Sequence, residues 1–139
     1  MPVIEGTAYW ASVKTPNTTY EPVYTVNLVV ADDVAADFRS RGFSVKDMNE
    51  GPAVVIKRKV NGPNGMVRPA PDLLDINKQP IDVAVGNGSK VKVQYKEWSS
   101  VWNGKTFHGL DFCKMQVLNL VEYGGIPDEL DVEEEIDEL

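Results

Sequence analysis

The sequence predicts an all-β protein with one short helix, arranged as a small antiparallel barrel or sandwich. Three observations support this prediction. Five to seven segments are rich in β-branched and aromatic residues or alternate apolar and polar side chains, as strands do. Gly, Pro and Asn separate these segments as turns require. Only one segment has the period of a helix. The 139 residues suffice for one domain with a buried core.

The beginning of the chain predicts two strands. Aromatic and β-branched residues favour a strand over 7–14, and we expect Trp10 to lie in the core because a strand tryptophan usually packs. A second strand is predicted over 23–30, with Val26 and Leu28 on its inward face. Pro and Asn between the two strands predict a turn.

A helix of about ten residues follows the second strand. Asp32 or Asp33 is the predicted N-cap, and Val34 and Phe38 lie four positions apart on one face. Gly42 is suited to the position just beyond the helix end. These signals predict a helix with one apolar face.

The middle of the chain is less regular. We expect a loop over 48–52 and then a strand over 53–60, which is apolar at its start and basic at its end. Frequent Gly and Pro predict an irregular connection over 61–72, and a short strand is expected near 82–85.

The segment 89–97 is the most regular strand of the sequence. Val91, Val93 and Tyr95 alternate with polar residues, so they predict one apolar face. The opposite face carries three of the chain's lysines: Lys90, Lys92 and Lys96. The alternative interpretation is an ordinary solvated strand face, on which lysines discourage aggregation.

The last strand is predicted over 106–121, after a loop over 99–105. Asn103-Gly104 is a turn signal within that loop, and Gly109 suggests a bulge or bend in the strand.

The negative charge is concentrated at the end of the chain. The formal net charge is −7, yet residues 128–138 hold eight of the 21 acids and no base, so the rest is nearly neutral. We expect a domain over 1–124 and a disordered acidic tail over 125–139. A purely solubilising end is the alternative to a tail that binds partners. The candidate partner-binding residues of the tail are Asp128, Glu129, Asp131, Glu133, Glu134, Glu135, Asp137, Glu138 and Leu139.

The sequence predicts no enzyme, metal site or cofactor. His108 and Cys113 are five positions apart on one predicted strand, so they should face opposite sides and cannot form a nucleophile pair. No cluster has zinc spacing. No apolar run is long enough for a membrane span, and the lack of an export signal together with a single cysteine favours the cytoplasm.

Basic and aromatic residues predict a nucleic-acid binding surface. Single-strand binding needs cations that follow the phosphates and flat side chains on which bases stack. A protein-interaction module without nucleic acid remains the alternative, because protein interfaces also use aromatic residues and Arg. The candidate cations are Lys57, Lys59, Arg68, Lys90, Lys92, Lys96 and Lys105, and the candidate stacking residues are Trp98, Trp102 and Phe107.

Four segments together resemble one family. They are VYTVNL at 23–28 before a helix, GNGSKVKVQY at 86–95, Trp102-Asn103, and residues 118–123 before Gly-Gly and the acidic tail. In this order they resemble the single-stranded DNA-binding protein of T7-like bacteriophages and their relatives. The chain departs from the T7 type in its shorter helix and in ending with Leu139 instead of an aromatic residue.

The resemblance implies an OB-fold, a five-stranded Greek-key barrel with an attached helix. It implies sequence-independent binding of single-stranded DNA in phage replication or recombination, in the cytoplasm of an infected bacterium, by a homodimer. DNA contacts are expected around Lys92, Lys96, Trp98 and Trp102. The tail is expected to compete with DNA and to recruit replication proteins, namely a polymerase and a helicase-primase.

Overall fold

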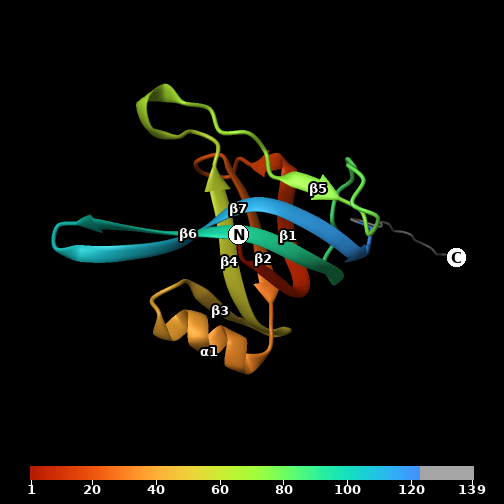
Figure 1. Ribbon diagram of the computed structural model, residues 1–139, viewed down its shortest axis with the longest axis horizontal. Coiled ribbons are helices and arrows are strands. Elements are labelled where there is room, and N and C mark those ends of the chain that lie inside the picture. Colours follow the sequence, from red (N-terminus) through yellow and green to blue (C-terminus); the bar gives the residue numbers. More distant parts are fainter. Residues whose placement is uncertain (123–139) are drawn as a thin grey trace, which may run out of the picture.

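A computed structural model describes residues 1–122, which form one seven-stranded sheet and one α-helix (Figure 1). This confirms the predicted mostly-β class with a short helix. The predicted tail, with its candidate residues Asp128 to Leu139, lies outside the described residues. The elements are β1 (Val3–Asn17), β2 (Val23–Val29), α1 (Asp32–Ser40), β3 (Val45–Met48), β4 (Gly51–Lys59), a 3-10 turn (Pro63–Gly65), β5 (Asp72–Leu74), β6 (Ser89–Trp102) and β7 (Lys105–Asn119).

The strands follow the order β3-β4-β2-β1-β6-β7-β5. Every neighbouring pair is antiparallel except β5 with β7, which is parallel. The resemblance implies five barrel strands, whereas the sheet has seven because the short strands β3 and β5 extend its two edges.

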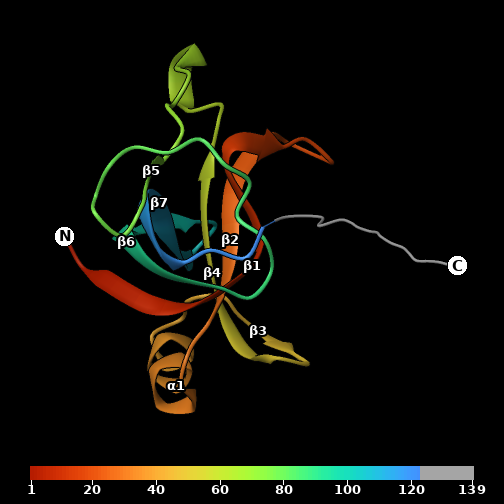
Figure 2. The same ribbon diagram turned by 90° about the vertical axis from the view of Figure 1, so that its right-hand side faces the viewer.

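The sheet curls around an apolar core, and α1 lies with β3 below the main strands in Figure 2. Val26 and Leu28 of β2 have no exposed surface, as predicted, and Phe38 of α1 packs edge-on against Tyr95 of β6. The other side chains with no exposed surface include Val54 and Ile56 of β4, Val91 and Val93 of β6, and Phe112 and Met115 of β7.

The two ends of α1 differ from each other in how well the sequence predicts them. The N-cap is Ala31, which has extended backbone and makes no side-chain cap, so the prediction of Asp32 or Asp33 is wrong. Both aspartates instead lie in the first turn, where their charge suits the helix dipole. Gly42 has a φ of +91°, which confirms its predicted place after the helix end.

Two predictions for the middle of the chain are wrong. Residues 48–52 do not form a loop, because β3 and β4 make a hairpin in which Met48 pairs with Gly51. The short strand is β5 at 72–74, whereas residues 82–84 form no strand and Val85 makes one bridge to Glu122.

Trp10 is 61% exposed, so its predicted place in the core is wrong. The register of β1 against β2 shifts between Tyr9 and Ser12, and Trp10 has a φ of +53°. Its amide donates to the Asn87 side chain at 2.8 Å instead of to a neighbouring strand. Such a bulge turns a side chain away from the sheet.

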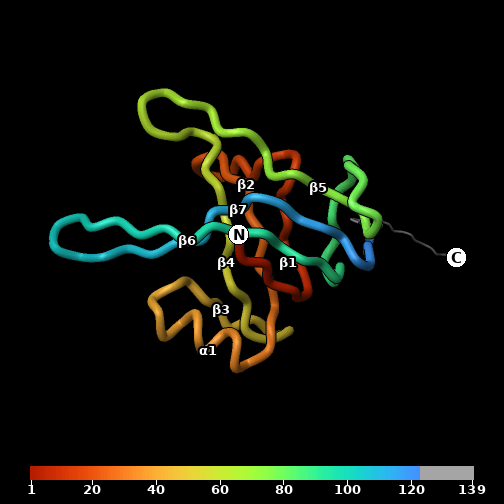
Figure 3. Tube along the Cα trace, in the orientation of Figure 1, coloured from red at the N-terminus to blue at the C-terminus, as the bar shows by residue number. Residues whose placement is uncertain are grey.

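The hairpin of β6 and β7 projects beyond the sheet, as the trace in Figure 3 shows. The predicted loop over 99–105 is therefore wrong, because both strands continue to a two-residue turn. Asn103 and Gly104 both have positive φ, which a type I′ hairpin turn requires. The register of β7 against β6 shifts at Cys113, between the pairs Gln94 with Lys114 and Tyr95 with Phe112. It shifts again at Leu118, and not at the predicted Gly109.

Candidate nucleic-acid interface

One face of the projecting hairpin gathers half of the predicted binding residues. Trp98 pairs with Gly109, Ser100 with Phe107, and Trp102 with Lys105. Directly paired residues point to the same face, and so do alternate residues along a strand. The residues that share this hairpin face are Lys96, Trp98, Trp102, Lys105 and Phe107.

Gly109 provides the space in which Trp98 lies. A methyl group at Gly109 would overlap the indole ring of Trp98, so the ring covers the glycine closely. An aromatic side chain laid over a strand glycine is a known way to stabilise such a site. Trp98 is nevertheless 47% exposed and Trp102 is 69% exposed, so both keep a large surface available.

A groove of about 600 Å³ brings Trp98 beside three predicted cations. In Figure 1 the hairpin extends to the left, and the connection between β4 and β5 loops out above it. Lys57 and Lys59 come from β4, and Arg68 comes from that connection. The complete lining is Glu21, Lys57, Lys59, Asn61, Gly62, Pro63, Met66, Arg68 and Trp98.

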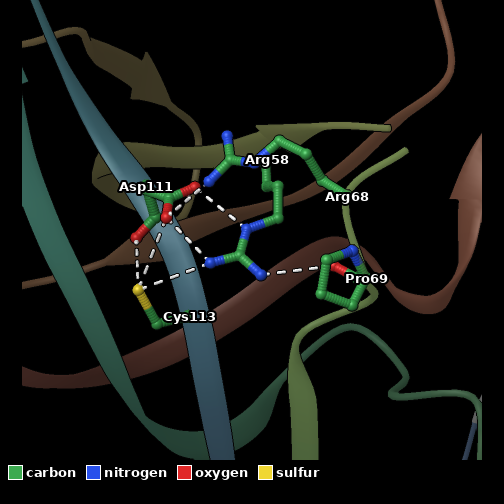
Figure 4. Close-up of polar contacts among 5 residues, drawn as sticks. All are labelled: Arg58, Arg68, Pro69, Asp111 and Cys113. Carbon is green, nitrogen blue, oxygen red and sulfur yellow. Dashed lines mark hydrogen bonds and ion pairs between the residues drawn. The ribbon is translucent and has the colours of Figure 1, made fainter. Parts of the chain in front are cut away.

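Asp111 of β7 joins two arginines, Arg58 and the groove residue Arg68 (Figure 4). It accepts from Arg58 Nε at 3.0 Å and Arg58 Nη2 at 2.8 Å, and its Oδ2 lies 2.9 Å from Arg68 Nη2. Arg58 also donates to the Pro69 carbonyl at 3.2 Å. The network therefore ties β4, β7 and the connection together.

The charges of the network shift the pKa of its members. Burial alone would raise the pKa of Asp111, but the hydrogen bonds and charge of Arg58 and the charge of Arg68 outweigh it and lower that pKa. The hydrogen bond with Asp111 raises the pKa of Arg58 against the effect of burial. Burial and the nearby Asp111 charge raise the pKa of the Cys113 thiol. Asp111 is thus ionised at neutral pH, between two arginines.

Of the predicted lysines of β6, Lys96 lies on the hairpin face, whereas Lys90 and Lys92 lie nearer the start of the strand. Lys90 and Lys92 alternate with buried residues as predicted, but Lys92 lines a second groove away from the tryptophans. Lys78 and Lys114 line that groove too, and sequence reasoning missed both. The bulge at Cys113 shifts the alternation of β7, so the face of Lys114 could not be read from the strand period. Lys90 donates to the Thr7 hydroxyl at 3.0 Å.

The lone histidine and cysteine have separate neighbours. The His108 ring lies 5.5 Å from the ring of Phe43, whereas the Cys113 sulfur contacts Asp111 and Arg58. Within residues 1–122 no three His, Cys, Asp or Glu side chains gather where they could hold a metal ion. Over the same residues no helix is long and apolar enough to cross a membrane.

The fold resembles solved structures of phage proteins, although no family model and no curated protein sequence matches the chain. Gp2.5, a single-stranded DNA-binding protein encoded by bacteriophage T7, has a TM-score of 0.64 at 14% identity, covering 94% of this chain and 99% of that one. The single-stranded DNA-binding protein of bacteriophage Enc34, in complex with ssDNA, has a TM-score of 0.59 at 12% identity, covering 88% and 89%. The predicted resemblance is thereby confirmed at the level of the fold.

Proposed function

We propose that this chain binds single-stranded DNA without sequence preference, using the hairpin face and the groove beside it. The observation that carries the proposal is the placement of exposed Trp98 next to Lys57, Lys59 and Arg68 in one groove. Phosphates and bases alternate along a single strand, so a binding surface needs both kinds of side chain within reach. The similar fold of the Enc34 protein, which was solved with ssDNA, supports the same conclusion.

Cations and aromatic rings have separate roles in this proposal. Each phosphate that a lysine or arginine neutralises contributes about −0.7 to the log–log salt slope. Each base stacked on an aromatic side chain contributes about 1–3 kcal/mol by alanine substitution. Stacking uses the flat face that all four bases share, which is why binding would be independent of sequence. The stacking residues would be Trp98, Trp102 and Phe107, and the cations would be Lys57, Lys59, Arg68, Lys96 and Lys105. Lys90 and Lys92, in their separate position, would bind only a longer strand.

The wider biological assignment rests on the resemblance. In this proposal β1, β2, β4, β6 and β7 form a Greek-key OB barrel within a domain over 1–124. The acidic tail over 125–139 competes with DNA for the basic groove and recruits replication proteins. The protein acts as a homodimer in phage replication or recombination, in the bacterial cytoplasm, and it is not an enzyme.

Intrinsic tryptophan fluorescence tests the proposal directly. The full chain is titrated with oligo-dT and with a duplex of equal length, at low and at high salt. We expect the single strand to quench the fluorescence strongly and added salt to weaken this effect. The absence of any change with the single strand at low salt would refute stacking and favour the protein-interaction module.

The three tryptophans provide a matched control for this titration. Trp10 is exposed like the others but lines a different hollow, with residues 11–17 and 82–85. Trp10→Phe should therefore retain the quenching, whereas the double change Trp98→Phe and Trp102→Phe should remove it while keeping aromatic rings. Quenching lost in Trp10→Phe alone would place the DNA elsewhere on the protein.

A further inference from the structure

Asp111 is an acid that contacts Arg68, a lining residue of the groove that should bind a polyanion. A carboxylate near a phosphate repels it, and the repulsion is stronger where the surroundings exclude water. Asp111 is only 8% exposed, and both of its oxygens accept from arginine. The negative charge of Asp111 is therefore paired with the protein's own arginines.

The two arginines that bind Asp111 differ in exposure. The Arg58 side chain is 13% exposed and makes its further contacts inside the protein, with the Pro69 carbonyl and the Cys113 sulfur. The Arg68 side chain is 33% exposed and lines the groove. An arginine has five N–H donors, and Arg68 approaches Asp111 with Nη2, which lies 2.9 Å from Oδ2. Arg68 can therefore hold Asp111 and a phosphate together.

The connection that carries Arg68 is anchored next to β5, where Pro71 is buried and its carbonyl accepts from Lys14 Nζ at 3.1 Å. It closes through a bridge between Asn61 and Val67, and the Arg68 amide donates to the Val60 carbonyl at 2.8 Å. Both contacts lie within the connection itself or at its root on β4. Asp111 contacts it from β7, directly through Arg68 and indirectly through Arg58 and Pro69.

We propose that Asp111 is a positioning residue for nucleic-acid binding: it fixes the Arg68 guanidinium and the connection after β4 at the wall of the groove. The inference rests on the proposed function and deepens it, because it assigns to an acid a favourable effect on the binding of an anion. If Asp111 only neutralises buried Arg58, removing its charge should strengthen the attraction of DNA.

Glu21 is a matched control, because it is an acid that lines this groove itself. It lies 3.7 Å from Lys59 and is half exposed, so it competes with phosphate for that lysine. Glu21→Gln and Asp111→Asn each remove one negative charge and keep the shape of the side chain. The two changes should alter DNA affinity in opposite directions. This difference distinguishes an effect on the position of Arg68 from an effect of net charge.

The experiment measures oligo-dT affinity of the full chain over a salt series, at a temperature at which each variant is folded by circular dichroism. Glu21→Gln should tighten binding. Asp111→Asn should weaken it about three- to tenfold, the effect of one lost hydrogen bond of typical net strength. It should also reduce the magnitude of the salt slope by about 0.7, because the Arg68 contact is lost. Arg68→Gln should give the same losses, and the double variant should lose no more than either single one.

Three results would overturn the inference. They are tighter binding by Asp111→Asn, an unchanged salt slope in that variant, or additive losses in the double variant. Should Asp111→Asn fail to fold, Arg68→Lys leaves the pair of Arg58 and Asp111 intact while removing the planar guanidinium. Arg68→Lys should bind more weakly than the wild type, and equal binding would contradict a positioned guanidinium. If the wild type itself binds no oligo-dT, the proposed function fails instead.

Discussion

Gly109→Ala tests whether the position of the Trp98 ring over Gly109 of β7 matters for DNA binding. The added methyl group would overlap the indole ring, so Trp98 has to move, while the backbone of Gly109 lacks the positive φ that would strain an alanine. Trp98 is half exposed, so its ring has solvent to move into, and the variant should fold with only the loss of the contact between ring and glycine. The effect should appear in binding.

The magnitude follows from the role of the ring. One stacked base contributes about 1–3 kcal/mol, so complete loss of stacking on Trp98 weakens oligo-dT binding by about 5- to 150-fold. Displacement of the ring should cost part of this range. The salt slope should stay the same, because no cation is changed. Titration of the purified variant against the wild type, at two salt concentrations, measures both quantities.

A double-mutant cycle shows whether Trp98 transmits the effect. In a Trp98→Ala background the methyl group at Gly109 has no ring to displace, so the second change should have no further effect on affinity. Two results would contradict this mechanism: Gly109→Ala still weakens binding in that background, or it has no effect in the wild type. In either case the contact of the Trp98 ring with Gly109 does not determine base stacking.

Three other outcomes are expected. Because the folded pKa of Asp111 is lowered, its contribution to stability is complete above the ordinary value of about 3.9 and is lost as pH falls through the folded pKa. Urea unfolding from pH 6 to pH 2.5 should show this loss, and Asp111→Asn should flatten it. Truncation after Gly125 removes the eight tail acids and should tighten oligo-dT binding and steepen its salt dependence; unchanged affinity would refute competition by the tail. Arg41→Ala removes a contact with Glu97 of the hairpin and should weaken binding more than Arg39→Ala does. Arg39 lies in the last turn of α1, two positions before Arg41, and pairs with Asp47 instead.

The sequence predicts the faces of strands well where alternation is uninterrupted. Val91, Val93 and Tyr95 are buried, and the alternating lysines Lys90, Lys92 and Lys96 are exposed, because a period of two leaves no other arrangement. The helix end at Gly42 was predictable for a similar reason, since positive φ favours glycine there. Both predictions depend on interactions between residues close together in the chain.

Predictions failed where a distant residue decides the local structure. Trp10 leaves the core because its amide bonds to Asn87, which is 77 positions away. The hairpin was expected to be a loop, although Asn103-Gly104 marked its turn, because strand continuation depends on pairing across that turn. The groove itself joins Lys57 and Lys59 to Trp98, a juxtaposition that no local pattern contains.

The two faces of the hairpin explain how its aromatic residues can stay exposed. A two-stranded hairpin is marginally stable alone, so a projecting one must be held at its root. The root face away from the groove is bound to the region after α1: Arg41 pairs with Glu97 at 3.0 Å, and Phe43 packs on His108. The Arg41 guanidinium also lies 5.1 Å from the centre of the Phe43 ring, which fixes it in this position. Because one face provides the support, Trp98 and Trp102 on the other face keep 47% and 69% of their surface exposed.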